Sequence, residues 1–173
     1  MFQSWRFKLR EADTAYRQGR YDEAIRILAE EDTSGPLPGR RLAEKVAESL
    51  AERARGRMIA GDMVEAWKDY ERITHVTGEG EQATLLRDEL IASVITDCQG
   101  LLQASEYDRC LAKLDDLIRR GSAVEPVVGL RETVRRVRSA DKLAQRGKFA
   151  EAIEQIKSAT SDGCKLGPRL SDY

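Results

Sequence analysis

The feature that most constrains this chain is a pattern of residues that recurs four times at nearly constant spacing. A small residue is followed seven positions later by Gly or Ser, then by an aromatic residue or Met, and then by a second small residue. The Gly or Ser marks are Gly19, Gly61, Ser105 and Gly147, so the repeats are 42, 44 and 42 residues apart. A fixed period of this length is typical of stacked supersecondary units.

Each mark of the pattern has a physical reason if the unit is a pair of helices joined by a tight turn. Gly is favoured where a chain leaves a helix through the left-handed region. The aromatic residue or Met two positions later opens the next helix, and the two small residues let facing helices approach closely. In the third repeat these small positions are Cys98 and Cys110.

Helical periodicity and break signals place four hairpins along the chain, at about 2–31, 40–77, 81–120 and 125–160. The Gly- and Pro-rich run 33–39 predicts a break after the first hairpin, and no useful length alternates with period two. We therefore expect an all-α fold of four antiparallel helical hairpins. It comprises one repeat domain, 1–160, and a tail or linker, 161–173.

The pattern resembles the tetratricopeptide repeat. The Gly-x-Tyr-x-Glu-Ala turn of that family is visible at 19–24 and, with Phe for Tyr, at 147–152, and the resemblance extends to about Thr160. The period exceeds the 34 residues of the family, and the family's Trp-x2-Leu-Gly opening and closing Pro are absent. The resemblance implies a tetratricopeptide-like α-solenoid, in which the first helices of the hairpins line a groove for a partner's peptide or helix.

By this resemblance the chain is a noncatalytic scaffold that binds another protein. The implied groove positions are Arg10, Asp13, Arg17, Glu52, Arg55, Gln99, Gln103, Arg138, Asp141 and Gln145. Family members that clamp a C-terminal carboxylate use Asn together with Lys or Arg. The chain contains no Asn, which argues against that clamp.

A second hypothesis is a coupling arm of a larger signalling protein. The opening residues 1–10 and the repeats that follow resemble the N-terminal region of bacterial proteins that continue into a forkhead-associated, phosphothreonine-binding domain. The last predicted helix carries Phe149, Ile153 and Ile156, and no later helix is predicted to cover them. A folded-back tail, residues 161–173, or pairing of two copies would cover the same edge.

The near-neutral net charge of −1 is unevenly distributed. Residues 79–121 carry a net charge of −4 and residues 122–173 a net charge of +3, a difference that could order the stacking of adjacent repeats or an end-to-end dimer. A third hypothesis is polyanion or nucleic-acid binding through a basic helix face. Its residues are Arg131, Arg135, Arg138 and Lys142. The alternative is a solvated face, and the missing basic excess argues against nucleic acid.

The sequence offers little chemistry for catalysis. His75 is the only histidine and is expected near the end of a helix, no nucleophile or phosphate-binding motif occurs, and the acidic runs fit solvated helix faces. We therefore expect no enzyme, cofactor or metal. Cys98 and Cys110 are expected to be buried, inert thiols, with a redox pair as the alternative.

The same sequence contains no signal-peptide pattern and no long apolar run. The three cysteines form neither a disulfide framework nor a zinc motif, which favours the cytoplasm.

Overall fold

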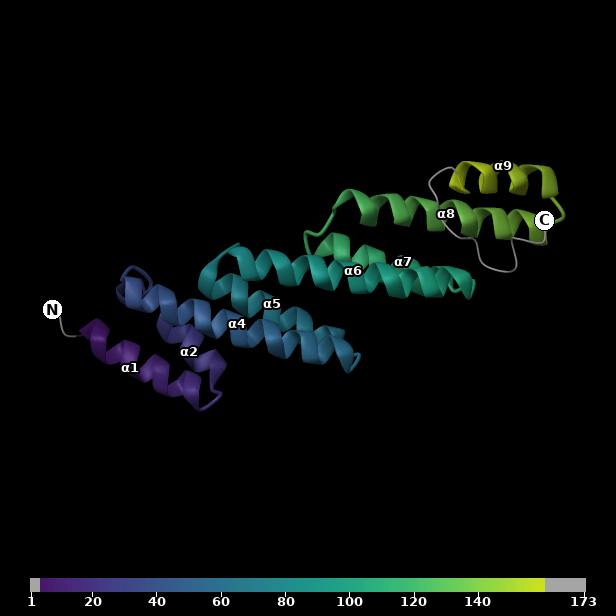
Figure 1. Ribbon diagram of the computed structural model, residues 1–173. Helices are drawn as coiled ribbons and strands as arrows, with labels where there is room; N and C mark the ends of the chain where they lie inside the picture. Colours follow the sequence, from purple (N-terminus) through teal and green to yellow (C-terminus); the bar gives the residue numbers. More distant parts are fainter. Residues whose placement is uncertain (1–3, 161–173) are drawn as a thin grey trace. The chain divides into compact units, whose positions relative to one another are not determined.

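The computed structural model describes residues 4–160, and every regular element among them is a helix (Figure 1). Their bounds are α1 Ser4–Arg17, α2 Tyr21–Leu28, α3 Glu31–Ser34, α4 Leu37–Ile59, α5 Met63–Thr77, α6 Glu81–Gln103, α7 Tyr107–Arg119, α8 Glu125–Gln145 and α9 Phe149–Thr160. Consecutive long helices pack as hairpins, so the predicted all-α fold is confirmed. The predicted tail 161–173 lies outside the described residues.

The four marked turns share one backbone conformation. Gly19, Gly61 and Gly147 have φ of 73°, 80° and 73°, and Ser105 has φ of 61°. At each turn the next residue donates its N–H to a carbonyl five residues back; at the third, Glu106 N lies 2.8 Å from Leu101 O. This is the Schellman arrangement, which satisfies carbonyls that a helix end leaves without partners.

The two small positions of every repeat are buried in the hairpin core. Ala12, Ala24, Ala54, Ala66, Cys98, Cys110, Ala140 and Ala152 are all at most 2% exposed. A short side chain at these positions allows the two helices of a hairpin to pack closely, and larger residues such as Leu50, Ile73 and Leu114 fill the remaining core.

The sequence predicts a continuous break between helices over residues 33–39, but part of this segment is helical. Residues 31–34 form the one-turn helix α3, and α4 begins at Leu37, so only Gly35 and Pro36 interrupt the helices. Pro38 fits because the first turn of a helix needs no internal N–H bond. Gly39 is buried, and a Cβ there would lie 1.9 Å from the carbonyl oxygen of Thr33. The missing side chain therefore lets α4 start against α3.

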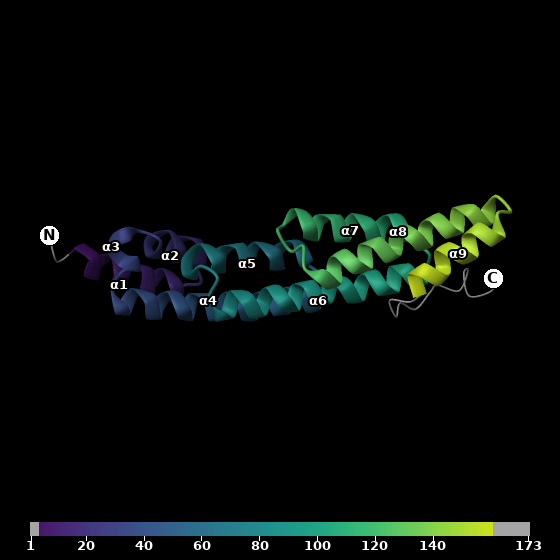
Figure 2. The ribbon, with the colours of Figure 1, turned by 90° about the horizontal axis from the view of Figure 1, so that it is seen from above.

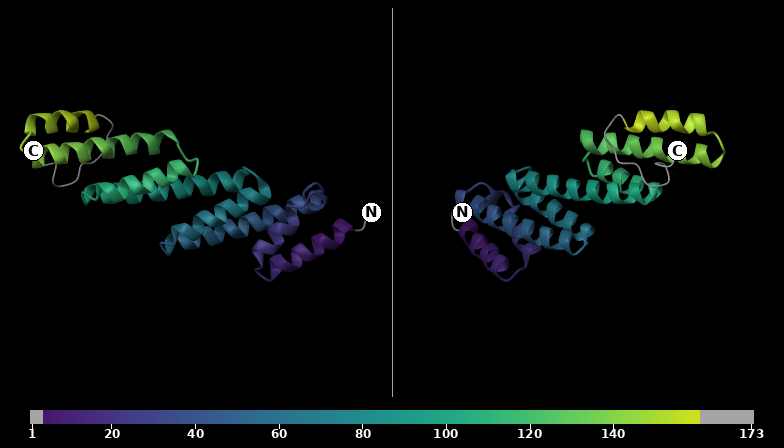
Figure 3. Two further views of the ribbon diagram at one scale, coloured as in Figure 1. Left: turned by 180° about the vertical axis from the view of Figure 1, so that it is seen from behind. Right: turned by 45° about the vertical axis from the view of Figure 1, so that its right-hand side comes forward.

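The chain divides into two compact units, Met1–Leu90 and Ile91–Tyr173, with the boundary inside α6. In the first unit, α2 contacts both α4 and α5, so the first hairpin stacks on the second (Figure 1). In the second unit, α8 packs against both α7 and α9, and Figures 2 and 3 show α8 and α9 side by side. Adjacent hairpins therefore stack within each unit.

Candidate partner-binding groove

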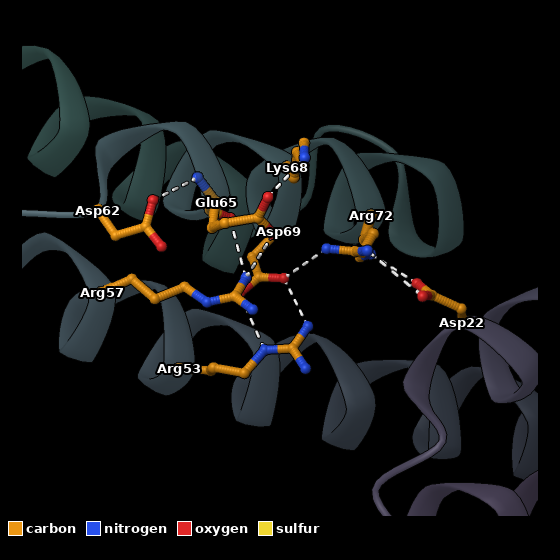
Figure 4. A network of polar contacts seen from close by, with 8 residues as sticks. All are labelled: Asp22, Arg53, Arg57, Asp62, Glu65, Lys68, Asp69 and Arg72. Carbon is orange, nitrogen blue, oxygen red and sulfur yellow. Dashed lines mark hydrogen bonds and ion pairs between the residues drawn. The ribbon is translucent and has the colours of Figure 1, made fainter.

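A buried carboxylate organises the first unit. Asp69 on α5 is 0% exposed, and both of its oxygens accept hydrogen bonds from arginines (Figure 4). Arg53 Nη2 lies 2.6 Å from Oδ1, and Arg57 Nη1 lies 2.6 Å from Oδ2. Arg72 Nη1 adds a bond of 3.0 Å to Oδ1. Removing a carboxylate from water is costly, and three guanidinium partners offset that cost.

The same arginines tie the second hairpin to the first. Arg72 also donates to Asp22 on α2, with Nε 2.6 Å from Oδ1 and Nη2 3.3 Å from Oδ2. Arg53 lies over the ring of Tyr21, 4.7 Å from its centroid, in a cation–π contact. Two residues at the start of α2 are thus fixed by a network centred on α5.

The first turn of α5 extends the network towards solvent. Asp62 caps the helix by accepting a hydrogen bond from the backbone N–H of Glu65, and the Glu65 side chain pairs with Lys68. The hydrogen bond from Lys68, helped by the charges of Arg57 and Arg72, lowers the pKa of Glu65 below its ordinary value.

An open groove of about 640 Å³ runs between α2 and α5, beside this network. Its lining residues are Asp22, Ile25, Arg26, Ala29, Glu30, Lys68, Glu71, Arg72 and His75. The Arg72–Asp22 bridge joins the two walls. Because Arg72 is also held by the buried Asp69, the spacing of the walls is fixed without any ligand. This groove is formed by second helices of the hairpins, whereas the resemblance places a groove on first helices.

The residues predicted from the resemblance lie on first helices, as expected from the helix bounds. Arg10, Gln99 and Gln103 are exposed. Asp13 pairs with Arg17 at 2.9 Å, and Asp141 accepts a hydrogen bond of 2.9 Å from Gln145.

Two of the predicted positions are engaged with another helix. Arg55 forms a two-point bridge to Glu89, with Nε 2.8 Å from Oε2, and this contact raises the pKa of the guanidinium. Arg138 pairs with Asp108 on α7 at 2.6 Å.

Most of the predicted basic face on α8 is already neutralised. Arg131 pairs with Asp115 on α7, and Arg135 pairs with Glu132 at 3.0 Å. With the Arg138–Asp108 pair, two of these bridges join the basic fourth hairpin to the acidic third. Among the described residues, Lys142 is the member of this face without an ion pair.

The two buried cysteines face each other across the third hairpin. The Cys110 thiol lies 3.5 Å from the carbonyl oxygen of Cys98, and the Cys98 thiol lies 3.7 Å from that of Cys110. The hydrogen bond with Cys110 and the nearby charge of Lys113 lower the pKa of Cys98, whereas burial opposes this shift.

Elsewhere His75 is exposed in the last turn of α5. Within residues 4–160 no group of three or more His, Cys, Asp or Glu side chains could hold a metal ion. In that same part of the chain, no helix has the length and apolar character needed to cross a bilayer.

Sequence reasoning missed the Asp69 network and the α2–α5 groove. The available signal was the spacing: Arg53 and Arg57 are one helical turn apart, as are Asp69 and Arg72, so each pair shares a helix face. That spacing does not reveal that the two faces meet, because exposed charged faces have the same pattern.

Comparison with known proteins identifies no relative of this chain. No protein-family model matches the chain, and no curated protein or solved structure matches it either.

Proposed function

We propose that this protein is a noncatalytic scaffold that binds a partner protein. The observation that carries the proposal is the distribution of buried and exposed side chains within the hairpins. Small residues and aliphatic side chains fill the cores, while polar residues on the first helices stay at the surface. Repeat proteins commonly use such surfaces for recognition, although a fold does not by itself define a function.

Photocrosslinking tests which helix face meets the partner. A benzophenone amino acid is placed at Gln99 or Gln103, two exposed positions on α6, and at Ala112 on α7 as the control, which is also exposed. We expect the α6 positions to capture one defined protein and the α7 position to capture none. The captured protein, once purified, should bind the unlabelled chain, and Gln99→Ala with Gln103→Ala should weaken that binding. Equal capture from α6 and α7 would contradict the proposed face.

The polyanion alternative receives less support, because Arg131, Arg135 and Arg138 all pair with carboxylates. Exposed pairs of this kind contribute little stability, but they still reduce the positive potential available to a polyanion. Weak, sequence-independent DNA binding that disappears in Arg131→Glu with Arg135→Glu would restore that alternative.

A further inference from the structure

We infer that the α2–α5 groove binds an acidic helical segment of a partner protein. The inference rests on the scaffold role proposed above. It adds a second binding surface and specifies the charge and the secondary structure of the partner segment.

The shape of the groove fits a helix. From α2 and its C-cap residue the lining includes Asp22, Ile25, Arg26 and Ala29, and from α5 it includes Lys68, Glu71, Arg72 and His75. Both series follow the spacing i, i+3, i+4 and i+7, so each wall is one face of a helix. Two such ridges enclose the trough in which a third helix packs, and the volume lies in the range of ligand sites. Ala29 is the exposed apolar residue of this trough, and Ile25 reaches it with only 5% of its surface exposed.

The lining carries three carboxylates and three basic side chains, and among the described residues Arg26 is the one of these six without a partner. Arg72 is paired with Asp22, and Glu30 is paired with Lys8. Arg26 is exposed and makes no ion pair or side-chain hydrogen bond with the rest of the described chain. Lys68 has only a surface pair with Glu65 on its own helix, and Glu71, the third lining carboxylate, also has an interaction partner. Cations thus stand on both walls, which favours carboxylates along the incoming helix.

The walls are also fixed in advance. Arg72 bonds to buried Asp69 on one side and to Asp22 on the other, so it holds α2 and α5 at a set distance (Figure 4). A preformed site avoids the ordering cost that weakens binding to mobile surfaces.

Fluorescence anisotropy tests the inference on the full chain at low ionic strength. The probe is a fluorescein-labelled peptide with Leu at positions i, i+3, i+4 and i+7 and Glu elsewhere, and its twin has Lys in place of Glu. We expect the acidic peptide to bind and the basic twin not to. Arg26→Gln with Lys68→Gln removes one cation from each wall and should weaken binding on the order of tenfold.

The matched control is Arg41→Gln with Lys45→Gln, which removes two exposed charges of α4 that have no partner among the described residues, and it should change the affinity less than about twofold. Circular dichroism checks the fold of each variant, and Arg26→Gln alone is the substitute if the double variant unfolds.

Three outcomes would overturn the inference. They are equal binding of both peptides or of neither, a loss in the Arg41→Gln, Lys45→Gln control equal to that in the groove variant, and equally tight, equally Arg26-dependent binding of a single-stranded oligonucleotide. None of them bears on the α6 crosslink. Conversely, failure of that crosslink would contradict the first-helix face while leaving the groove intact.

Discussion

Ser105 holds a backbone conformation that glycine holds at the three equivalent turns. A side chain in the left-handed region clashes with its own backbone, at a cost of roughly 1–2 kcal/mol. Part of this is offset because glycine loses more entropy on folding. We expect Ser105→Gly to raise the free energy of unfolding by about 0.5–1 kcal/mol. Urea denaturation measures this change.

The reverse substitution is the control. Gly61→Ser should lower the free energy of unfolding by a similar amount, since nothing lies within 4 Å of the position that a Cβ would take. Equal effects of the same sign at both positions would show that φ is not the cause.

Asp69 is the single carboxylate shared by three arginines, so its charge matters more than its volume. Asp69→Asn keeps the shape but removes the buried counter-charge that the three guanidinium groups share, and we expect a loss of about 3 kcal/mol. The side chains of the three arginines are 26–33% exposed, so partial hydration limits the loss. Thermal and urea unfolding provide the measurement.

Asp22→Asn serves as the comparison at the exposed end of the same network. The Asp22 side chain is 74% exposed, and the substitution should cost less than about 1 kcal/mol. If Asp69→Asn costs no more than Asp22→Asn, the buried cluster does not stabilise the fold.

At the scale of elements, the junction of α3 and α4 depends on a missing side chain. In Gly39→Ala the new Cβ meets backbone atoms of Thr33, which cannot rotate away. We expect destabilisation of about 1–3 kcal/mol, measured as a lower thermal midpoint. Gly56→Ala is the control inside α4, where a Cβ meets nothing within 4 Å and better helix propensity should stabilise by about 0.5–1 kcal/mol. Stabilisation by both would argue against close contact at Gly39.

The α6–α7 pair contains two thiols that an external reagent reaches only if the helices separate. The pKa of Cys98 is lowered, which favours the reactive thiolate, but both residues are 0% exposed. Access should therefore control the rate. In a Cys164→Ser background we expect maleimide labelling of Cys98 and Cys110 to accelerate with urea in step with unfolding. Fast labelling or a rapid Cys98–Cys110 disulfide in native buffer would instead support a redox pair.

At the scale of the whole molecule, 30 acidic and 29 basic residues nearly balance at neutral pH. The lowered pKa of Glu65 means that the folded protein binds its proton less readily than the unfolded chain does. Its stabilisation is therefore present above the ordinary glutamate pKa of about 4.3 and is lost as the pH falls through the lower folded value. We expect Glu65→Gln to reduce the acid sensitivity of the unfolding free energy, measured by urea titrations from neutral to acidic pH. Parallel curves for both proteins would contradict this linkage.

The hairpins could be predicted because their signals are local. A turn that contains one residue in the left-handed region favours Gly at that position and tolerates Ser. Such residues mark the four turns directly, at Gly19, Gly61, Ser105 and Gly147. The prediction of a break at 33–39 was only partly right, because Pro and Gly indicate an interruption but do not reveal that Gly39 packs against Thr33.

The Asp69 network and the groove could not be predicted, because they depend on contacts between residues far apart in the sequence. They depend on which helix faces meet, and partners such as Arg72 and Asp22 are 50 residues apart. Arg55 and Arg138 show the same limit: their positions on first helices were predictable, but their ion pairs with Glu89 and Asp108 were not.

The repeated turn geometry has a consequence for how such a chain can change in length. The four marked turns are closed by backbone hydrogen bonds between residues at the same sequence separation, so their local geometry is equivalent. A few residues gained or lost within a long helix would rotate one helix face away from its neighbour by about 100° per residue. A duplication of 42–44 residues, from one mark to the next, inserts one whole hairpin and keeps the flanking helices in phase. We therefore expect the chain to tolerate added length in steps of one whole hairpin.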